Sequence, residues 1–169
     1  MTEWLNPTER RAWRTLVALT TRLPAAMDTQ LQREAGMTHF EYLLMALLSE
    51  EPGHRLQLSE LAGKANASLS RLSHVITKME RLGWARREVM RGRRGAYAVL
   101  TEAGCAQVDH ATPSYLEGVR GLVFDGIDDQ QVEQLLSLTE TLVSQLDEGL
   151  SRGIGRADGV PDPPAPAPS

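Results

Sequence analysis

The chain has one cysteine among its 169 residues, Cys105, so it can form no internal disulfide bond. A single thiol fits a reducing compartment. No apolar run approaches the roughly 20 residues that a membrane-spanning helix needs. The first residues also lack the basic and then apolar pattern of a signal peptide. We therefore expect a cytoplasmic protein with no membrane segment.

Sequence signatures of catalysis are also missing. The chain has no nucleophile elbow, no glycine-rich phosphate loop and no pair of cysteines. The four histidines, His39, His54, His74 and His110, include no pair at the four-residue spacing that helical metal sites favour. We therefore expect a protein that is not an enzyme and has no cofactor and no metal ion. Cys105 is interpreted as an inert thiol, because only a helix end would lower its pKa.

Positive charge is concentrated in one segment of an acidic chain. The chain has 18 Lys and Arg residues against 22 Asp and Glu residues, for a net charge of −4. Eight of the cations fall between Arg71 and Arg94, where only Glu80 and Glu88 oppose them. That segment therefore carries +6 and the remainder −10. Such a partition favours a site for a polyanion.

The basic segment begins with a predicted amphipathic helix. Ser68 is a good N-cap, and Gly83 can end the helix in a left-handed conformation. Apolar residues at three- and four-residue steps predict a buried face made of Leu69, Leu72, Val75, Ile76, Met79 and Leu82. The opposite face carries Ser70, Arg71, His74, Thr77, Lys78 and Arg81. A helix of this kind can enter a DNA major groove, although a solvated cationic face would have the same pattern.

A basic β-hairpin is predicted directly after this helix. Residues 84–90 and 96–100 have strand character, and Gly92 and Gly95 permit the positive φ angles of a short turn. The turn places Arg91, Arg93 and Arg94 at an exposed tip, where arginine suits a narrow minor groove or phosphate contacts. Solubilising charge at a loop tip is the alternative. A helix followed so closely by a basic hairpin favours DNA binding.

Capping signals predict the remaining helices. Asn6, Pro7 and Glu9 start a helix over about residues 7–35, which Pro24 should kink and Gly36 should end. A capping box of Thr38 and Glu41 starts a second helix, which Pro52 and Gly53 end. A short strand is expected over residues 55–58. Ser59 should cap a short helix over residues 60–65, and a tight turn then joins it to the basic helix as a helix-turn-helix.

Two more helices are predicted after the hairpin. Thr101 caps the first, which Pro113 should bend, and Asp128 caps the second. The second has an apolar stripe made of Val132, Leu135, Leu138, Leu142, Val143, Leu146 and Leu150. We expect these helices and the first helix to form a dimer interface, although they could instead pack within one chain. The proline-rich stretch from Arg152 onward is expected to be disordered.

The run from Leu56 to Gly104 resembles the winged helix-turn-helix core of the MarR family of bacterial transcriptional regulators. The specific points are LSELA at residues 58–62, MERLG at 79–83 and LTEAG at 100–104. With the flanking helices, the resemblance covers about residues 4 to 150. It implies a homodimeric regulator, expected to be a repressor, that binds a pseudo-palindromic operator on double-stranded DNA. The DNA contacts that it implies are Ser68, Ser70, Arg71, Ser73, His74, Lys78, Arg91, Arg93 and Arg94.

The expected fold is therefore mainly α-helical with a small β-hairpin. It comprises an N-terminal dimerisation helix (1–35), a winged helix-turn-helix (37–101), C-terminal dimerisation helices (102–151) and a disordered tail (152–169). One position departs from the family pattern, because Gly92 stands where the wing usually has an aspartate that orients its arginines. This departure predicts a less ordered wing, with Arg91 compensating electrostatically.

The resemblance also implies a small aromatic or lipophilic effector that releases the DNA. Residues expected to line its pocket are Trp13, Leu16, Thr20, His39, Tyr42 and Met45, although plain core packing would give the same spacing. Two alternatives stay open. One is a winged helix that binds a protein instead of DNA, which the missing wing aspartate would suit. The other is a metal-responsive regulator, because some relatives bind zinc where His39, Glu41, Asp109 and His110 fall.

Overall fold

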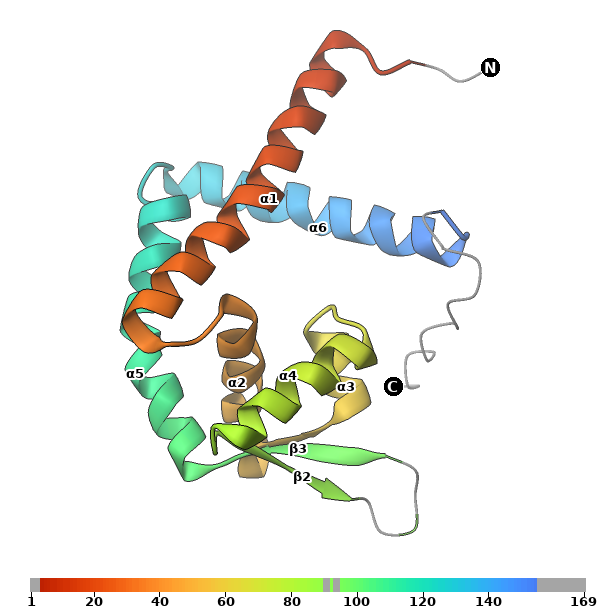
Figure 1. The fold of residues 1–169 in the computed structure, drawn as a ribbon. Helices are drawn as coiled ribbons and strands as arrows, with labels where there is room; N and C mark the ends of the chain where they lie inside the picture. The colour runs from red at the N-terminus through yellow and green to blue at the C-terminus, as the bar shows by residue number, and fades with distance from the viewer. Residues whose placement is uncertain (1–3, 90–91, 93–94, 155–169) are drawn as a thin grey trace. The chain divides into compact units, whose positions relative to one another are not determined.

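The structure, a computed structural model, describes residues 4–89, 92 and 95–154 (Figure 1). The chain divides into two compact units. The first ends at Val123 and contains the helix-turn-helix and the sheet, and the second begins at Phe124. The fold is mainly helical with one small antiparallel sheet, as the sequence predicts. No helix in the described part of the chain is long and apolar enough to cross a membrane.

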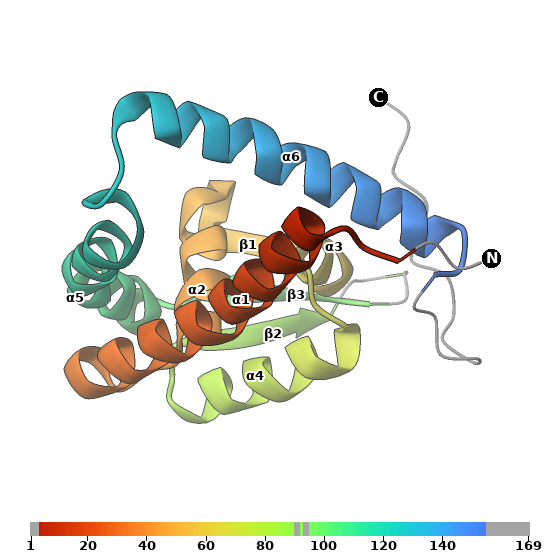
Figure 2. The ribbon, with the colours of Figure 1, turned by 90° about the horizontal axis from the view of Figure 1, so that it is seen from above.

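The first unit begins with the long helix α1 (Pro7–Ala35). The Asn6 side chain accepts a hydrogen bond from the Glu9 N–H, and the Glu9 carboxylate accepts one from the Asn6 N–H, so the predicted capping box is confirmed. The helix continues through Pro24 and ends at Gly36, which has a φ of 66°. Only its C-terminal half is buried, at Met27 and Leu31. That half lies along α5 (Figures 1 and 2).

Helices α2 (His39–Glu50), α3 (Leu58–Lys64) and α4 (Leu69–Arg81) follow. Between α2 and α3 lie a 3-10 turn (Pro52–His54) and the short strand β1 (Arg55–Gln57). The predicted start of α3 is wrong, because the helix begins two residues earlier, at Leu58. The Glu60 carboxylate accepts from the Gln57 N–H at 3.4 Å, so Gln57 and not Ser59 is the N-cap.

The sheet contains the predicted hairpin and one further strand. Strands β2 (Ala85–Val89) and β3 (Ala96–Leu100) pair antiparallel, with Ala85 opposite Leu100. Strand β1 pairs with the other edge of β3, which gives the order β1-β3-β2. The central strand β3 is buried at its C-terminal end, and it continues through the N-cap Thr101 into α5 (Glu102–Val119).

Helix α5 is followed by a π-helical turn (Arg120–Phe124), and the second unit contains α6 (Asp129–Ser151). The capping box of α6 is confirmed, because Asp128 accepts from the Gln131 N–H at 2.8 Å. Gly149 is the one buried residue of α6. In the apolar stripe of this helix, Val132 and Leu135 are half-buried and the other members are exposed. The predicted tail falls almost wholly outside the described residues, which end at Ile154.

The core of the first unit lies between α2, α3, α4, α5 and the sheet. Its fully buried side chains include Leu44, Met45 and Leu48 of α2, and Leu72, Ile76 and Met79 of α4. Two predictions for the inner face of α4 are wrong, because Leu69 is 57% exposed and Leu82 is 46% exposed. Both lie at the ends of the helix, and the core covers only the middle turns.

Candidate nucleic-acid interface

Helix α4 has an exposed polar face between two caps that the sequence predicts. The Ser68 hydroxyl accepts a hydrogen bond from the Arg71 N–H at 3.2 Å, which satisfies one free donor of the first turn. At the other end, Gly83 has a φ of 76°, and the Trp84 N–H donates to the Met79 carbonyl at 2.9 Å. The exposed residues of α4 between these two caps include Ser70, Arg71, Ser73, His74, Thr77 and Arg81.

Arg71 lies over an aromatic ring. Its guanidinium carbon is 4.0 Å from the centroid of the Phe40 ring, which belongs to α2. Guanidinium groups are attracted to the negative face of an aromatic ring. The stacking therefore limits where the Arg71 side chain can go while leaving the residue exposed. An arginine restrained in this way is suited to bidentate recognition of a guanine edge.

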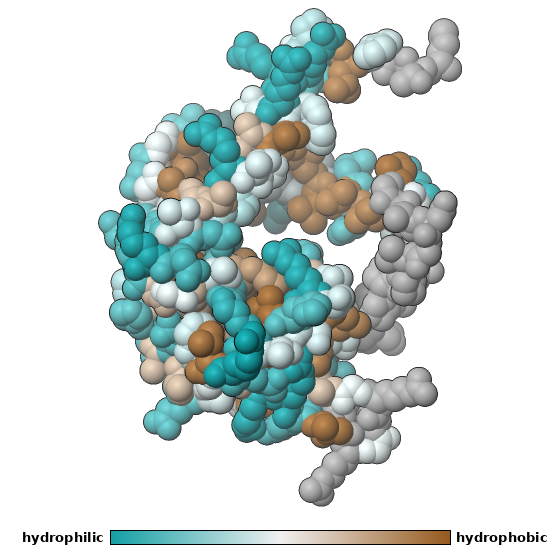
Figure 3. Space-filling model, viewed as in Figure 1, coloured by the Kyte–Doolittle hydropathy of each residue, from teal (hydrophilic) through white to brown (hydrophobic). Residues whose placement is uncertain are grey.

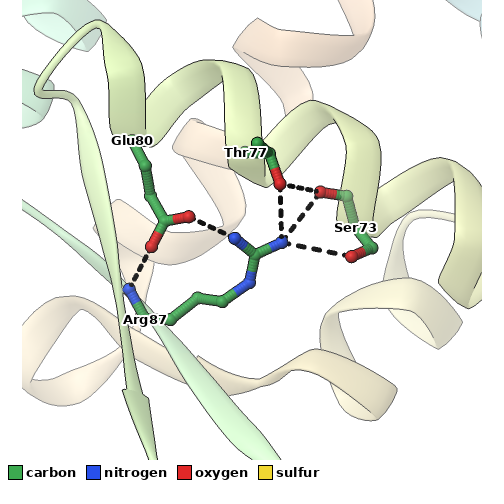
Figure 4. Close-up of polar contacts among 4 residues, drawn as sticks. All are labelled: Ser73, Thr77, Glu80 and Arg87. Atoms are coloured by element: carbon green, nitrogen blue, oxygen red, sulfur yellow. Dashed lines mark hydrogen bonds and ion pairs between the residues drawn. The ribbon is translucent and has the colours of Figure 1, made fainter.

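Arg87 of β2 is held against α4 by several hydrogen bonds (Figure 4). Its guanidinium donates to the Glu80 carboxylate, to the Ser73 carbonyl at 2.8 Å and to the Thr77 hydroxyl at 3.1 Å. The Arg87 N–H also donates to Glu80, at 2.9 Å. Helix α4 and strand β2 lie side by side in both views (Figures 1 and 2). These contacts fix the helix relative to the hairpin that carries the wing.

The Ser73 hydroxyl is therefore already in a hydrogen bond within the protein. Its hydroxyl accepts from Arg87 at 3.1 Å. A hydroxyl has two lone pairs and one rotatable proton, so Ser73 keeps a donor for another partner. The predicted role of Ser73 at DNA stays a prediction, and the structure adds a second role in attaching β2.

Lys78 also has a partner within the fold. Its ammonium nitrogen is 2.5 Å from a carboxylate oxygen of Glu41, whose side chain is only 3% exposed. No local pattern in the sequence indicates this contact, because Glu41 lies 37 positions earlier in the chain. Among the predicted contacts on α4, Lys78 is thus the one whose charge is neutralised inside the protein.

The tip of the wing falls outside the described residues at Arg91, Arg93 and Arg94. Gly92 lies within the described residues. Its φ of 75° is in the left-handed region, which favours glycine over other residues. The sheet carries two more cations, Arg55 on β1 and Arg86 on β2. The Arg55 guanidinium lies 4.0 Å from the centroid of the Tyr97 ring, and Arg55 and Arg86 both form ion pairs with Glu88.

The residues predicted to line an effector pocket divide into two groups. Trp13 and Thr20 are exposed on α1, and Leu16 is half-buried there. On α2, Met45 is fully buried and Tyr42 is 5% exposed, with its hydroxyl 3.1 Å from that of Thr112. The α1 group lies beside shallow hollows, one of which is lined by Thr15, Ala18, Leu19, Arg22, Leu23, Ala26 and Leu122.

His39 belongs to the α2 group and stacks on Tyr115 of α5, with 5.9 Å between the ring centroids. Tyr115 in turn stacks on Tyr42. Burial lowers the pKa of His39 below its usual value of 6.5, and the nearby Asp28 carboxylate opposes that shift. Burial also raises the pKa of the Tyr115 hydroxyl. This aromatic group joins α2 to α5 as part of the core rather than opening a pocket.

Within the described part of the chain, no group of three or more His, Cys, Asp and Glu side chains is placed to hold a metal ion. The four candidates do not come together as a metal site: Glu41 pairs with Lys78, and His39 stacks on Tyr115. Cys105 is half-buried beside the core and is a free thiol.

The geometry defines a winged helix-turn-helix protein. Comparisons with known proteins show which family it belongs to. No protein-family model matches the chain, and no curated protein matches it. It is 36% identical to Sco3205 of Streptomyces coelicolor, a MarR family transcriptional regulator whose crystal structure is a complex with DNA. That match covers 86% of this chain and 92% of Sco3205, with a TM-score of 0.83.

A second regulator, AbsC of Streptomyces coelicolor, is 34% identical over 87% of this chain and 99% of AbsC, with a TM-score of 0.82. Sco5413, from the same organism, has a TM-score of 0.72 at 17% identity and shows the fold alone. The chain belongs to the MarR family of transcriptional regulators. It is a DNA-binding regulator, and the resemblance that the sequence motifs indicated is confirmed.

Four residues at this interface were absent from the sequence-based prediction: Phe40, Glu41, Glu80 and Arg87. Glu41 was identified as a capping residue, but its partner on α4 was not. Glu80 and Arg87 are seven positions apart across a helix end, and this spacing by itself indicates no contact. The only available signal was that a charged residue on a mostly buried element needs a partner.

Proposed function

We propose that the chain acts as a homodimer that binds a pseudo-palindromic DNA operator and represses transcription. In this proposal the N-terminal half of α4 enters a major groove, with Ser68, Ser70, Arg71, Ser73 and His74 near base edges and phosphates. The arginines of the wing, Arg91, Arg93 and Arg94, reach the adjacent minor groove. The observation that carries the proposal is the exposed polar face of α4 in a chain 36% identical to a DNA-bound regulator.

Exposed apolar residues support the dimer. Helix α6 carries Leu138, Leu142, Leu146 and Leu150 at four-residue steps, each between 44% and 63% exposed. Helix α1 exposes Trp13, Val17 and Leu19. Brown apolar atoms are visible over α6 and beside the N-terminal end of α1 (Figure 3). An exposed apolar row such as that along α6 is rare on a monomer and is typical of an interface between chains.

The dimer is tested by sedimentation equilibrium of the full chain and of a Leu142→Glu, Leu146→Glu double variant. We expect a wild-type mass of two chains and a mass of one chain for the variant. A matched control is Gln134→Glu, which adds one charge at an exposed position of the same helix outside the apolar row. A wild-type protein that stays monomeric at micromolar concentration would refute the homodimer.

DNA binding is tested by selecting bound duplexes from a random pool and then measuring their affinity over a salt series. Because phosphate contacts release counterions, the logarithm of the affinity should fall linearly with the logarithm of salt concentration. The selected sequences should contain two inverted half-sites. Repression is tested separately, by placing the selected operator over a reporter promoter. Higher expression with the regulator present would indicate an activator, and no selected sequence would favour the protein-binding alternative.

We further propose that a small aromatic or lipophilic effector weakens DNA binding. Its binding would involve residues near α1 and α2, where Trp13, Leu16, Thr20, His39, Tyr42 and Met45 lie. The half-buried Leu16 and the shallow hollows along α1 support this placement. The test is release of labelled operator by a panel of aromatic carboxylates and medium-chain fatty acids. An effector that acts equally on a Leu16→Ala variant would place the site elsewhere.

A further inference from the structure

The ion pair between Lys78 and Glu41 assigns Lys78 a function that its sequence position does not indicate. Among the residues that the structure describes, Glu41 is the one buried residue with a charged side chain, at 2% exposure. The Lys78 side chain is 42% exposed, yet its ammonium nitrogen points inward to within 2.5 Å of the Glu41 carboxylate. A buried carboxylate requires such compensation, because removing one partner leaves an unpaired charge in a poorly solvated place.

The position of the Glu41 carboxylate is itself fixed. Its second oxygen accepts a hydrogen bond from the Thr38 N–H at 2.8 Å, and the Glu41 N–H donates to the Thr38 hydroxyl at 3.1 Å. The first turn of α2 therefore holds one carboxylate oxygen of Glu41, and Lys78 contacts the other. The neighbouring His39 N–H donates to Asp28 of α1 at 2.7 Å. Lys78 is thereby attached to the first turn of α2, which is also hydrogen-bonded to α1.

We propose that Lys78 is a positioning residue for DNA recognition, which through Glu41 fixes the orientation of α4 on α2 and neutralises no DNA phosphate. This inference rests on the proposed placement of α4 in a major groove. If Lys78 turned outward to a phosphate, it would leave the buried Glu41 carboxylate unpaired. An ammonium that stays on the Glu41 carboxylate neutralises no phosphate and so releases no condensed counterion from the DNA, and its share of the salt dependence is small.

The proposal is tested with three variants of the full chain: Lys78→Met, Glu41→Gln and the double variant. Their affinity for a selected operator is measured by fluorescence anisotropy at several salt concentrations. We expect each single change to lower the affinity about tenfold or more at every salt concentration, with an unchanged slope. Because both remove the same contact, the double variant should lose no more than either single variant.

A phosphate contact by Lys78 predicts different results. Lys78→Met would then reduce the salt slope by about 0.9 for each bound copy of the chain. Glu41→Gln would leave the affinity unchanged or raise it, because it frees the ammonium. Either result overturns the proposal. If Lys78→Met does not fold, as judged by circular dichroism, Glu41→Gln decides alone. A positioning role predicts a lower affinity for this variant, whereas a phosphate contact predicts an unchanged or higher one.

Lys64→Met is the matched control, since Lys64 forms an ion pair with Glu51 in which both side chains are partly exposed. It loses the same charge and the same kind of contact, and we expect its affinity to stay within about twofold of wild type, as is usual for surface pairs. A larger loss in Lys64→Met than in Lys78→Met would contradict a special role for the buried pair. A wild-type protein that selects no sequence refutes the proposed function itself, whereas a changed slope refutes only this inference.

Discussion

Glu80 on α4 accepts two hydrogen bonds from Arg87 on β2, one from its backbone N–H and one from its guanidinium. The two residues connect α4, the helix proposed to face DNA, with the hairpin that carries the wing. Arg87 is about one quarter exposed, so its contacts are only partly screened by water. The relative placement of the helix and the wing thus depends on one arginine that is not at the tip of the wing.

We expect Arg87→Met to lower the free energy of unfolding by about 2 to 3 kcal/mol, since it removes charge-assisted hydrogen bonds and leaves Glu80 unpaired. Urea denaturation followed by circular dichroism measures the change. Arg86→Met is the matched control, because Arg86 is exposed and pairs with Glu88 at the surface. Its expected cost is below about 1 kcal/mol. Equal losses in the two variants would show that the contacts with α4 add nothing.

Gly104 lies in the first turn of α5 with no room for a side chain. A Cβ atom there would overlap the Trp84 carbonyl oxygen and lie 2.7 Å from a methyl carbon of Leu100. We expect Gly104→Ala to cost about 1 to 3 kcal/mol or more in unfolding free energy, because the backbone would have to move. Thermal unfolding measures it.

Gly63→Ala is the control for that substitution, because a Cβ at Gly63 of α3 would have nothing within 4 Å. Alanine is favoured over glycine inside a helix by up to about 1 kcal/mol, so this variant should be as stable as the wild type or more stable. A Gly104→Ala protein as stable as Gly63→Ala would contradict the close approach of α5 to the start of β2.

His39 should make the stability depend on pH. Its pKa is lowered in the folded chain, mainly by burial, so the unfolded chain binds a proton more readily. The stability contribution of neutral His39 is therefore present above its usual pKa and is lost as the pH falls through the lowered value. We expect the melting temperature to decrease more between about pH 7.5 and about pH 5 in wild type than in His39→Asn. Parallel curves for the two proteins would contradict this prediction.

Arg71 and Arg94 should affect DNA binding in different ways. Arg71 lies on the exposed face of α4 over the Phe40 ring, so Arg71→Ala should change which bases are preferred, by about 1 to 3 kcal/mol at one position. Arg94→Ala, at the predicted wing tip, should weaken binding to all sequences alike and reduce the salt slope. Repeating the selection with each variant measures both effects. Unaltered binding by Arg94→Ala would remove the wing from the proposed contacts.

The sequence alone determined where most elements begin and end. Asn6, Thr38, Ser68, Thr101 and Asp128 each cap a helix as predicted, because capping depends on residues within one turn of each other. The hairpin strands were also predictable, since the strand character of their residues and the glycines between them are local signals. The one wrong cap, at Ser59, arose because Gln57 and Glu60 form an equally local pairing two residues earlier.

Only the tertiary structure decided which of the polar residues on α4 are free to reach a ligand. Periodicity places Lys78 on the outer face, and the family resemblance implies Ser73 as a DNA contact. Their partners come from Glu41 on an earlier helix and Arg87 on a later strand. Periodicity likewise predicted burial for Leu69, which the core does not reach. The period of a helix defines its faces, whereas contacts between elements depend on how those faces meet in space, and no local pattern encodes that.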